Sequence, residues 1–107
     1  MALIHLNYSF PGVPGASIPA EWAHSGVVGS GDMEVLLHRR DQGGLVNVSV
    51  CTPVRGFDKV WELVLQRFVQ QSGCGDLDLE INDNNATPFI VTLRLQQALL
   101  EAREGAE

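Results

Sequence analysis

The segment from Phe57 to Ser72 constrains the fold most strongly, because it carries one apolar stripe at helical spacing. Apolar side chains recur three and four positions apart, which is the spacing of one face of an α-helix. The residues of the stripe are Phe57, Val60, Trp61, Val64, Leu65 and Phe68. Asp58 lies in the first turn, where a negative charge is favourable, and Gly73 follows where helices commonly end. The segment therefore predicts an amphipathic helix that packs against another element.

Other segments alternate apolar and polar residues with period two, which predicts strands. Such segments are 1–10, 27–37, 46–50 and 77–81, with 27–37 interrupted at Gly29-Ser30-Gly31. The turn sequence Asp41-Gln42-Gly43-Gly44 predicts that 27–37 and 46–50 pair as an antiparallel hairpin. Because only one face of each strand is apolar, we expect the sheet to be covered on one side only.

The two remaining segments differ in character. Three prolines and two glycines between positions 11 and 19 predict that 11–24 forms a flexible loop or arm on the surface. At the other end of the chain, Thr87-Pro88 favours a helix from about Pro88. The alternation of apolar residues over 91–95 leaves a short strand before Gln96 as an alternative.

These elements predict an α+β fold: a small, mostly antiparallel sheet of about four strands with two helices packed on one face. A length of 107 residues is typical of one domain, so we expect 1–107 to form a single domain. With 45% hydrophobic residues the chain has material for a core but not for a deep catalytic cavity as well. This size favours a protein that presents a group over one that encloses a substrate.

Composition excludes several classes of function. The net charge of −6 comes without a basic stripe, which argues against nucleic-acid binding. No apolar run approaches the ~20 residues of a membrane span, and the N-terminus lacks the pattern of a secretory signal. We therefore expect a soluble cytoplasmic protein. Cys51 and Cys74 are too far apart for a C-x-x-C pair, and idle reduced thiols are the better interpretation.

Enzymatic signatures are also missing, and we expect neither catalytic residues nor a metal site. Gly29-Ser30-Gly31 lacks the third glycine of a dinucleotide-binding loop, and Val28 stands where a G-x-S-x-G elbow needs glycine. The histidines, at positions 5, 24 and 38, are scattered. The carboxylates Asp76, Asp78 and Glu80 alternate along one strand and are typical of a solvated face.

The segment Gly29-Ser30-Gly31-Asp32 allows two interpretations. The first is structural, in which the glycines form a bulge or tight corner at the entry to a strand. The second is a modification site, because flanking glycines expose the Ser30 hydroxyl and the following strand gives it a firm base. Asp32 could orient Ser30 or assist a metal-bearing transferase, although a plain solvated turn residue is also consistent with the pattern.

The run from Val28 to Leu37, Val-Gly-Ser-Gly-Asp-Met-Glu-Val-Leu-Leu, resembles the serine site of the acyl-carrier (delta) subunit of malonate decarboxylase. Further similar blocks lie in family order at 56–61, 80–88 and 93–98, so the resemblance covers most of the chain from position 27 to about 101. The carrier subunit of citrate lyase is a more distant relative. Met33 replaces the usual leucine, and residues 11–24 run longer than expected.

The resemblance implies a specific function. It implies that the Ser30 hydroxyl is joined by a phosphodiester to a phosphoribosyl-dephospho-coenzyme A group, with Gly29, Gly31 and Asp32 in support. The terminal thiol of that arm carries acetyl, which is exchanged for malonyl. Partners implied are the acyl-transferase and decarboxylase subunits, a prosthetic-group transferase and a malonyl transacylase. On this hypothesis the chain is a non-catalytic carrier; the alternative is a non-covalent interaction or regulatory domain, and a stand-alone enzyme comes third.

Overall fold

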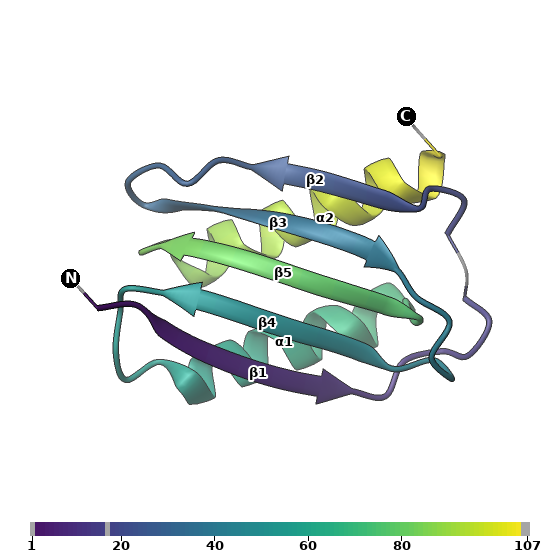
Figure 1. Ribbon diagram of the computed structural model, residues 1–107, viewed down its shortest axis with the longest axis horizontal. Coiled ribbons are helices and arrows are strands. Elements are labelled where there is room, and N and C mark those ends of the chain that lie inside the picture. Colours follow the sequence, from purple (N-terminus) through teal and green to yellow (C-terminus); the bar gives the residue numbers. More distant parts are fainter. Residues whose placement is uncertain (1, 17, 106–107) are drawn as a thin grey trace.

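The computed structural model describes residues 2–16 and 18–105 as one five-stranded sheet with both helices on the same face (Figure 1). The strands are β1 (Ile4–Phe10), β2 (Trp22–Gly26), β3 (Asp32–Arg39), β4 (Val46–Thr52) and β5 (Leu77–Asn84), and the helices are α1 (Asp58–Ser72) and α2 (Pro88–Glu104). The α+β class and the two helices on one face agree with the prediction. The sheet has one strand more than the four expected.

The order of the strands corrects the predicted hairpin between 27–37 and 46–50. The sheet runs β1-β4-β5-β3-β2, so β5 lies between β3 and β4 and pairs with both. The pairing of β4 with β5 is parallel, because α1 carries the chain back across the sheet between them. The inner side chains of β5, Leu77, Leu79 and Ile81, are buried, so this strand gains most from the central position.

A second correction concerns the segment before Ser30. The loop expected over 11–24 extends too far, because Trp22–Gly26 forms β2 and pairs antiparallel with β3. Conversely, Val27 and Val28 lie outside any strand and are exposed. Apolar alternation could not reveal β2, since it is an edge strand in which only Ala23 is buried. Residues 27–31 therefore form the connection of a β2–β3 hairpin. Flexibility of the preceding loop stays a prediction.

Helix α2 decides the ambiguity over 88–95 in favour of the helix. Thr87 caps its start by accepting a hydrogen bond from the backbone N–H of Ile90, and Pro88 occupies the first turn. Val91 and Leu95, four positions apart, are buried on the sheet, whereas Leu93 between them is only partly buried. Helical packing thus accounts for an apolar pattern that also fitted a strand.

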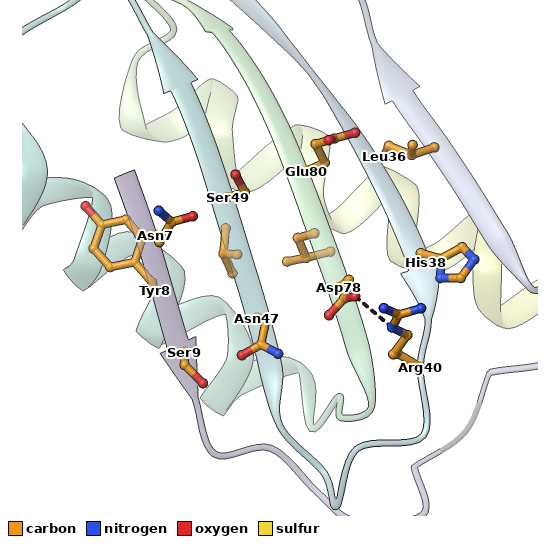
Figure 2. A pocket seen from close by; sticks show the side chains of 12 residues that line it. Asn7, Tyr8, Ser9, Leu36, His38, Arg40, Asn47, Ser49, Asp78 and Glu80 are labelled. Carbon is orange, nitrogen blue, oxygen red and sulfur yellow. Dashed lines mark ion pairs between the residues drawn. The ribbon is translucent and has the colours of Figure 1, made fainter. Parts of the chain in front are cut away.

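The two faces of the sheet differ as predicted. Trp61, Leu65 and Phe68 of α1 and the buried stripe of α2 cover the inner face. The outer face remains open and polar, with Asn7, Asn47, Ser49, Asp78 and Glu80 among its side chains (Figure 2). Arg40 pairs with Asp78 there at 3.2 Å. Within the described part of the chain, no helix is long and apolar enough to cross a membrane.

Candidate functional site

Ser30 lies at the tip of a tight β-turn between β2 and β3. The backbone N–H of Asp32 donates to the carbonyl of Gly29 at 3.0 Å, which closes a four-residue turn. Gly31, in the third position of this turn, has φ +74°, a value that a type II turn requires and that glycine adopts without strain. Ser30 occupies the second position. The sequence Gly-Ser-Gly therefore is a corner, as the structural interpretation states, and the serine is at its apex.

The surroundings of Ser30 are open. Its side chain is exposed, and among the described residues none forms a hydrogen bond with its hydroxyl. A methyl group built on Gly31 would meet nothing within 4 Å, and one built on Gly29 would meet only a Val27 side-chain atom at 3.8 Å. The hydroxyl is therefore exposed to solution, and no side chain crowds the glycines on either side of it.

The turn is tied to the body of the molecule on two sides. On one side, the backbone N–H of Gly31 donates to the carbonyl of Asn84, the last residue of β5, at 2.8 Å. On the other, the carboxylate of Asp32 accepts two hydrogen bonds from Arg94 of α2, from Nε at 2.9 Å and from Nη2 at 2.7 Å. A paired guanidinium and carboxylate fix both distance and orientation. The exposed serine thus stands directly before a rigid anchor.

The carboxylate of Asp32 is fully engaged in this anchor. The hydrogen bonds from Arg94, and then the one from the backbone N–H of Met33 at 2.7 Å, hold the pKa of Asp32 below its usual value. The same contact raises the pKa of Arg94. Asp32 makes no hydrogen bond to Ser30, so its role in the structure is to hold the turn in place through Arg94.

Gly26 makes room for this ion pair. It has φ +84°, and a side chain there would overlap the backbone carbonyl oxygen of Met33 and lie 3.1 Å from Cδ of Arg94. Beyond Arg94, the side-chain oxygen of Gln97 accepts from Arg94 Nη1 at 3.0 Å and from the Ser25 hydroxyl at 2.9 Å. The network therefore links the end of β2, the start of β3 and one face of α2.

Sequence reasoning singled out Asp32 but missed Gly26, Asn84, Arg94 and Gln97. The spacing of Arg94 and Gln97 on a predicted helix puts them on one face, and both lie in the block 93–98 that resembles the carrier family, but neither signal gives them a partner. The pairing of Arg94 with a residue 62 positions earlier follows from the packing of α2 against β2 and β3, which no local pattern contains.

Other candidate chemical groups do not gather near Ser30. No cluster of three or more histidine, cysteine or acidic side chains able to hold a metal occurs within residues 2–16 and 18–105. His24 contacts Glu34 at 3.3 Å on the open face of the sheet. Cys51 and Cys74 are both free thiols, and burial raises the pKa of Cys74.

This arrangement suits a hydroxyl that is modified better than a hydroxyl that attacks a substrate. A catalytic serine needs a base within hydrogen-bonding reach and donors for the developing oxyanion. No described residue forms a hydrogen bond with the Ser30 hydroxyl, and the carboxylate closest to it in the sequence, that of Asp32, is held by Arg94. What the turn offers is a presented hydroxyl on a fixed base.

Comparison with known proteins supports a carrier with this build. The family described as malonate decarboxylase delta subunit (MdcD) matches residues 20–102, a span that includes the whole β2–β3 turn, Asn84 and Arg94. The malonate decarboxylase acyl carrier protein of Malonomonas rubra is 47% identical over 105 residues, which is 98% of this chain and 94% of that protein. The protein of the same name from Xanthomonas campestris pv. campestris (strain B100) is 40% identical over 102 residues, 95% of this chain and 96% of that protein.

A solved structure agrees with this relationship. The chain is similar, with a TM-score of 0.82 and 34% sequence identity, to a chain in the crystal structure of a Pseudomonas malonate decarboxylase hetero-tetramer in complex with malonate. The match covers 92% of this chain and 98% of that one. Sequence and fold thus agree over nearly the full length, and the chain belongs to the family of malonate decarboxylase acyl carrier proteins.

Proposed function

We propose that the chain carries acetyl and malonyl groups as thioesters on a phosphoribosyl-dephospho-coenzyme A arm, joined to the Ser30 hydroxyl by a phosphodiester. Membership of the acyl carrier family supports the carrier role. The observation that carries the attachment point is the exposed Ser30 hydroxyl, which has no hydrogen-bond partner among the described residues and lies at the apex of an anchored turn.

The residues around Ser30 fit a bulky substituent. Gly29 and Gly31 leave open space on both sides of the serine, and the ion pair of Asp32 with Arg94 fixes the backbone that follows it. The arm supplies a terminal thiol that holds an acyl group as a thioester, whose carbonyl can delocalise the charge left by loss of carbon dioxide. The chain itself presents the arm and keeps its point of attachment fixed.

A small protein can assist a decarboxylase by holding the substrate on a covalently attached arm. Holding a substrate on an arm raises its effective concentration at each site that the arm can reach. We propose that the arm serves the acyl-transferase and decarboxylase subunits, receives malonyl with the help of a malonyl transacylase, and is installed by a prosthetic-group transferase. The net charge of −6 suits docking to basic surfaces on such partners.

Intact mass spectrometry tests the attachment. The chain is co-expressed with the family's maturation enzymes, and the wild type is expected to gain the mass of one arm. Ser30→Ala is expected to gain nothing, whereas the control Ser49→Ala, at an exposed serine of β4, gains the full increment. Because Ser30 is exposed and its hydroxyl has no hydrogen bond among the described residues, the free energy of unfolding of this variant should lie within about 0.5 kcal/mol of the wild type.

Two results would contradict the proposal: an unmodified wild type under conditions that modify a related carrier, or a modified Ser30→Ala protein. Fragmentation of the peptide that contains Ser30 identifies the modified atom. If Ser30→Ala instead supports full decarboxylase activity in the reconstituted complex, the chain acts as a non-covalent interaction domain.

A further inference from the structure

A small pocket opens at the same end of the molecule as Ser30. Its volume is about 280 Å³, and it lies between the first turns of α1 and α2, beside the ends of β4 and β5. The main lining residues are Phe57, Val60, Trp61, Asn85, Pro88 and Val91. In Figure 1 the β2–β3 turn, the ends of β4 and β5 and the starts of both helices all lie at the left of the view.

A single backbone hydrogen bond connects the serine turn to the segment that lines the pocket. Gly31 follows Ser30 and donates to the carbonyl of Asn84, while the neighbours of Asn84, Asp83 and Asn85, line the pocket. One chain step on each side of that hydrogen bond places the α-carbons of Ser30 and Asn85 at most about 14 Å apart. An arm built from a nucleotide and a pantetheine chain is considerably longer than this, so its end can reach the pocket from Ser30.

The lining selects for an uncharged occupant. Phe57 and Val60 line the pocket and are 49% and 41% exposed, so apolar surface of the pocket is in contact with water. The one carboxylate in the wall, that of Asp83, is already satisfied, because it accepts from the Thr52 hydroxyl at 2.8 Å and from the backbone N–H groups of Asn85 and Ala86. A mostly apolar wall with a few polar groups is typical of a small-molecule site.

We propose that this pocket, which we call the α1–α2 pocket, receives the uncharged end of the arm, the pantetheine chain with its thiol or acetyl thioester. The inference rests on the proposed attachment at Ser30. A volume of about 280 Å³ suits the end of the arm and not its nucleotide part. Docking there removes the apolar side chains of Phe57 and Val60 from water and shields the thioester from hydrolysis until a partner site draws the arm out.

The two tryptophans of the chain give a direct readout with an internal control. Trp61 lines the α1–α2 pocket, whereas Trp22 is 59% exposed at the start of β2 and pairs with His38, at the opposite end of the hairpin from Ser30. Protein labelled with 5-fluorotryptophan shows one ¹⁹F signal for each, and Trp22→Phe assigns them. On acquiring the acetyl-loaded arm, the Trp61 signal is expected to shift while the Trp22 signal stays in place.

A matched pair of variants on α1 locates the effect. Val60→Glu puts a charge at the pocket opening and is expected to abolish the shift of Trp61, while the mass still shows the arm on Ser30. Leu63→Glu adds the same charge at an exposed position, 47% accessible, that does not line the pocket, and it should leave the shift intact.

The outcomes separate the two hypotheses. If mass spectrometry shows the arm on Ser30 but the Trp61 signal keeps its unmodified position, or shifts equally in Val60→Glu, the pocket does not hold the arm and the carrier function stands. If the mass shows no arm at all, both the attachment at Ser30 and the pocket inference are wrong.

Discussion

Glycines and an aspartate lie next to both ends of β5, but the space around them differs. At its end, next to Ser30, Gly29 and Gly31 face open space and Asp32 bonds a side chain of α2. At its start, Gly75 is packed against the backbone of Val13, and a side chain there would overlap the Val13 carbonyl oxygen. The surroundings of Gly29 and Gly31, which we call the open end, have space for an added group. The surroundings of Gly75, which we call the closed end, do not have space even for a methyl group.

The aspartates show the same contrast. Asp76 is buried and precedes β5, which corrects its prediction as part of a solvated strand face. It has φ +59°, and its carboxylate accepts from the backbone N–H groups of Gln42 at 3.0 Å, Gly44 at 2.7 Å and Gly15 at 3.2 Å. It thereby ties two loops to the start of β5. Asp32 makes a comparable number of hydrogen bonds but leaves its neighbour Ser30 free. The two glycine-containing segments are similar in sequence but differ in exposure: Ser30 is exposed, whereas Gly75 is packed against Val13.

The largest effect is expected at the closed end. Gly75→Ala forces a methyl group into the Val13 carbonyl and should lower the free energy of unfolding by about 3 kcal/mol or more, measured by urea denaturation. Gly29→Ala is the matched change at the open end, where the added methyl meets only an ordinary contact; it should stay within about 1 kcal/mol of the wild type. Equal losses in the two variants would remove the contrast between the ends.

Acid should weaken the closed end through Asp76. Hydrogen bonds from the backbone N–H groups of Gln42, Gly44 and Gly15 lower the pKa of its carboxyl in the folded state. Its contribution to stability is therefore complete above the unfolded pKa of about 3.9 and is lost as the pH falls through the lower folded pKa. Asp76→Asn should be less stable than the wild type at neutral pH, and its urea midpoint should fall less than that of the wild type between pH 7 and pH 3. Some acid dependence should remain, because the pKa of Asp32 is also lowered in the folded state. An unchanged acid dependence would show that Asp76 contributes nothing to it.

A smaller loss is expected at Gly31, and for a different reason. An alanine there has space but must adopt φ +74°, which costs about 1–2 kcal/mol for a residue with a side chain. Equilibrium unfolding measures this cost. Gly31→Asn, which tolerates the left-handed region better, should recover part of it. If alanine and asparagine are equally costly, backbone strain is not the cause.

The smallest global effect, but a local one, is expected from the anchor of the serine turn. Arg94→Ala removes both hydrogen bonds to Asp32 and should speed amide hydrogen exchange at Gly31, Asp32 and Met33 several-fold, and slow attachment of the arm. Arg94→Lys keeps the charge without the paired geometry and should lie between the wild type and the alanine variant. The control Arg40→Ala, which breaks an exposed pair with Asp78, should leave the turn unchanged. Equal exchange in Arg94→Ala and Arg40→Ala would show that Arg94 does not hold the turn.

Local patterns predicted the elements whose side chains alternate between core and solvent. The stripe from Phe57 to Phe68, the alternation in β1, β3, β4 and β5, and the cap at Thr87 all reflect contacts within one element, so they are legible in the sequence. The same holds for the exposed glycine-flanked Ser30, since the turn is formed by four consecutive residues. The resemblance to the carrier family added the chemistry of the arm, which no pattern of residues contains.

Local patterns in the sequence thus predicted the α+β class, the two helices on one face and the position of the serine corner. Three features became visible only in the folded chain: β5 lies between β3 and β4, Trp22–Gly26 forms an edge strand, and Arg94 holds Asp32. The physical reason is distance along the chain. Periodicity records how each residue divides between core and water, whereas the order of strands and the partner of a charge depend on contacts between segments tens of residues apart, whose stability is set by the packing of the whole sheet.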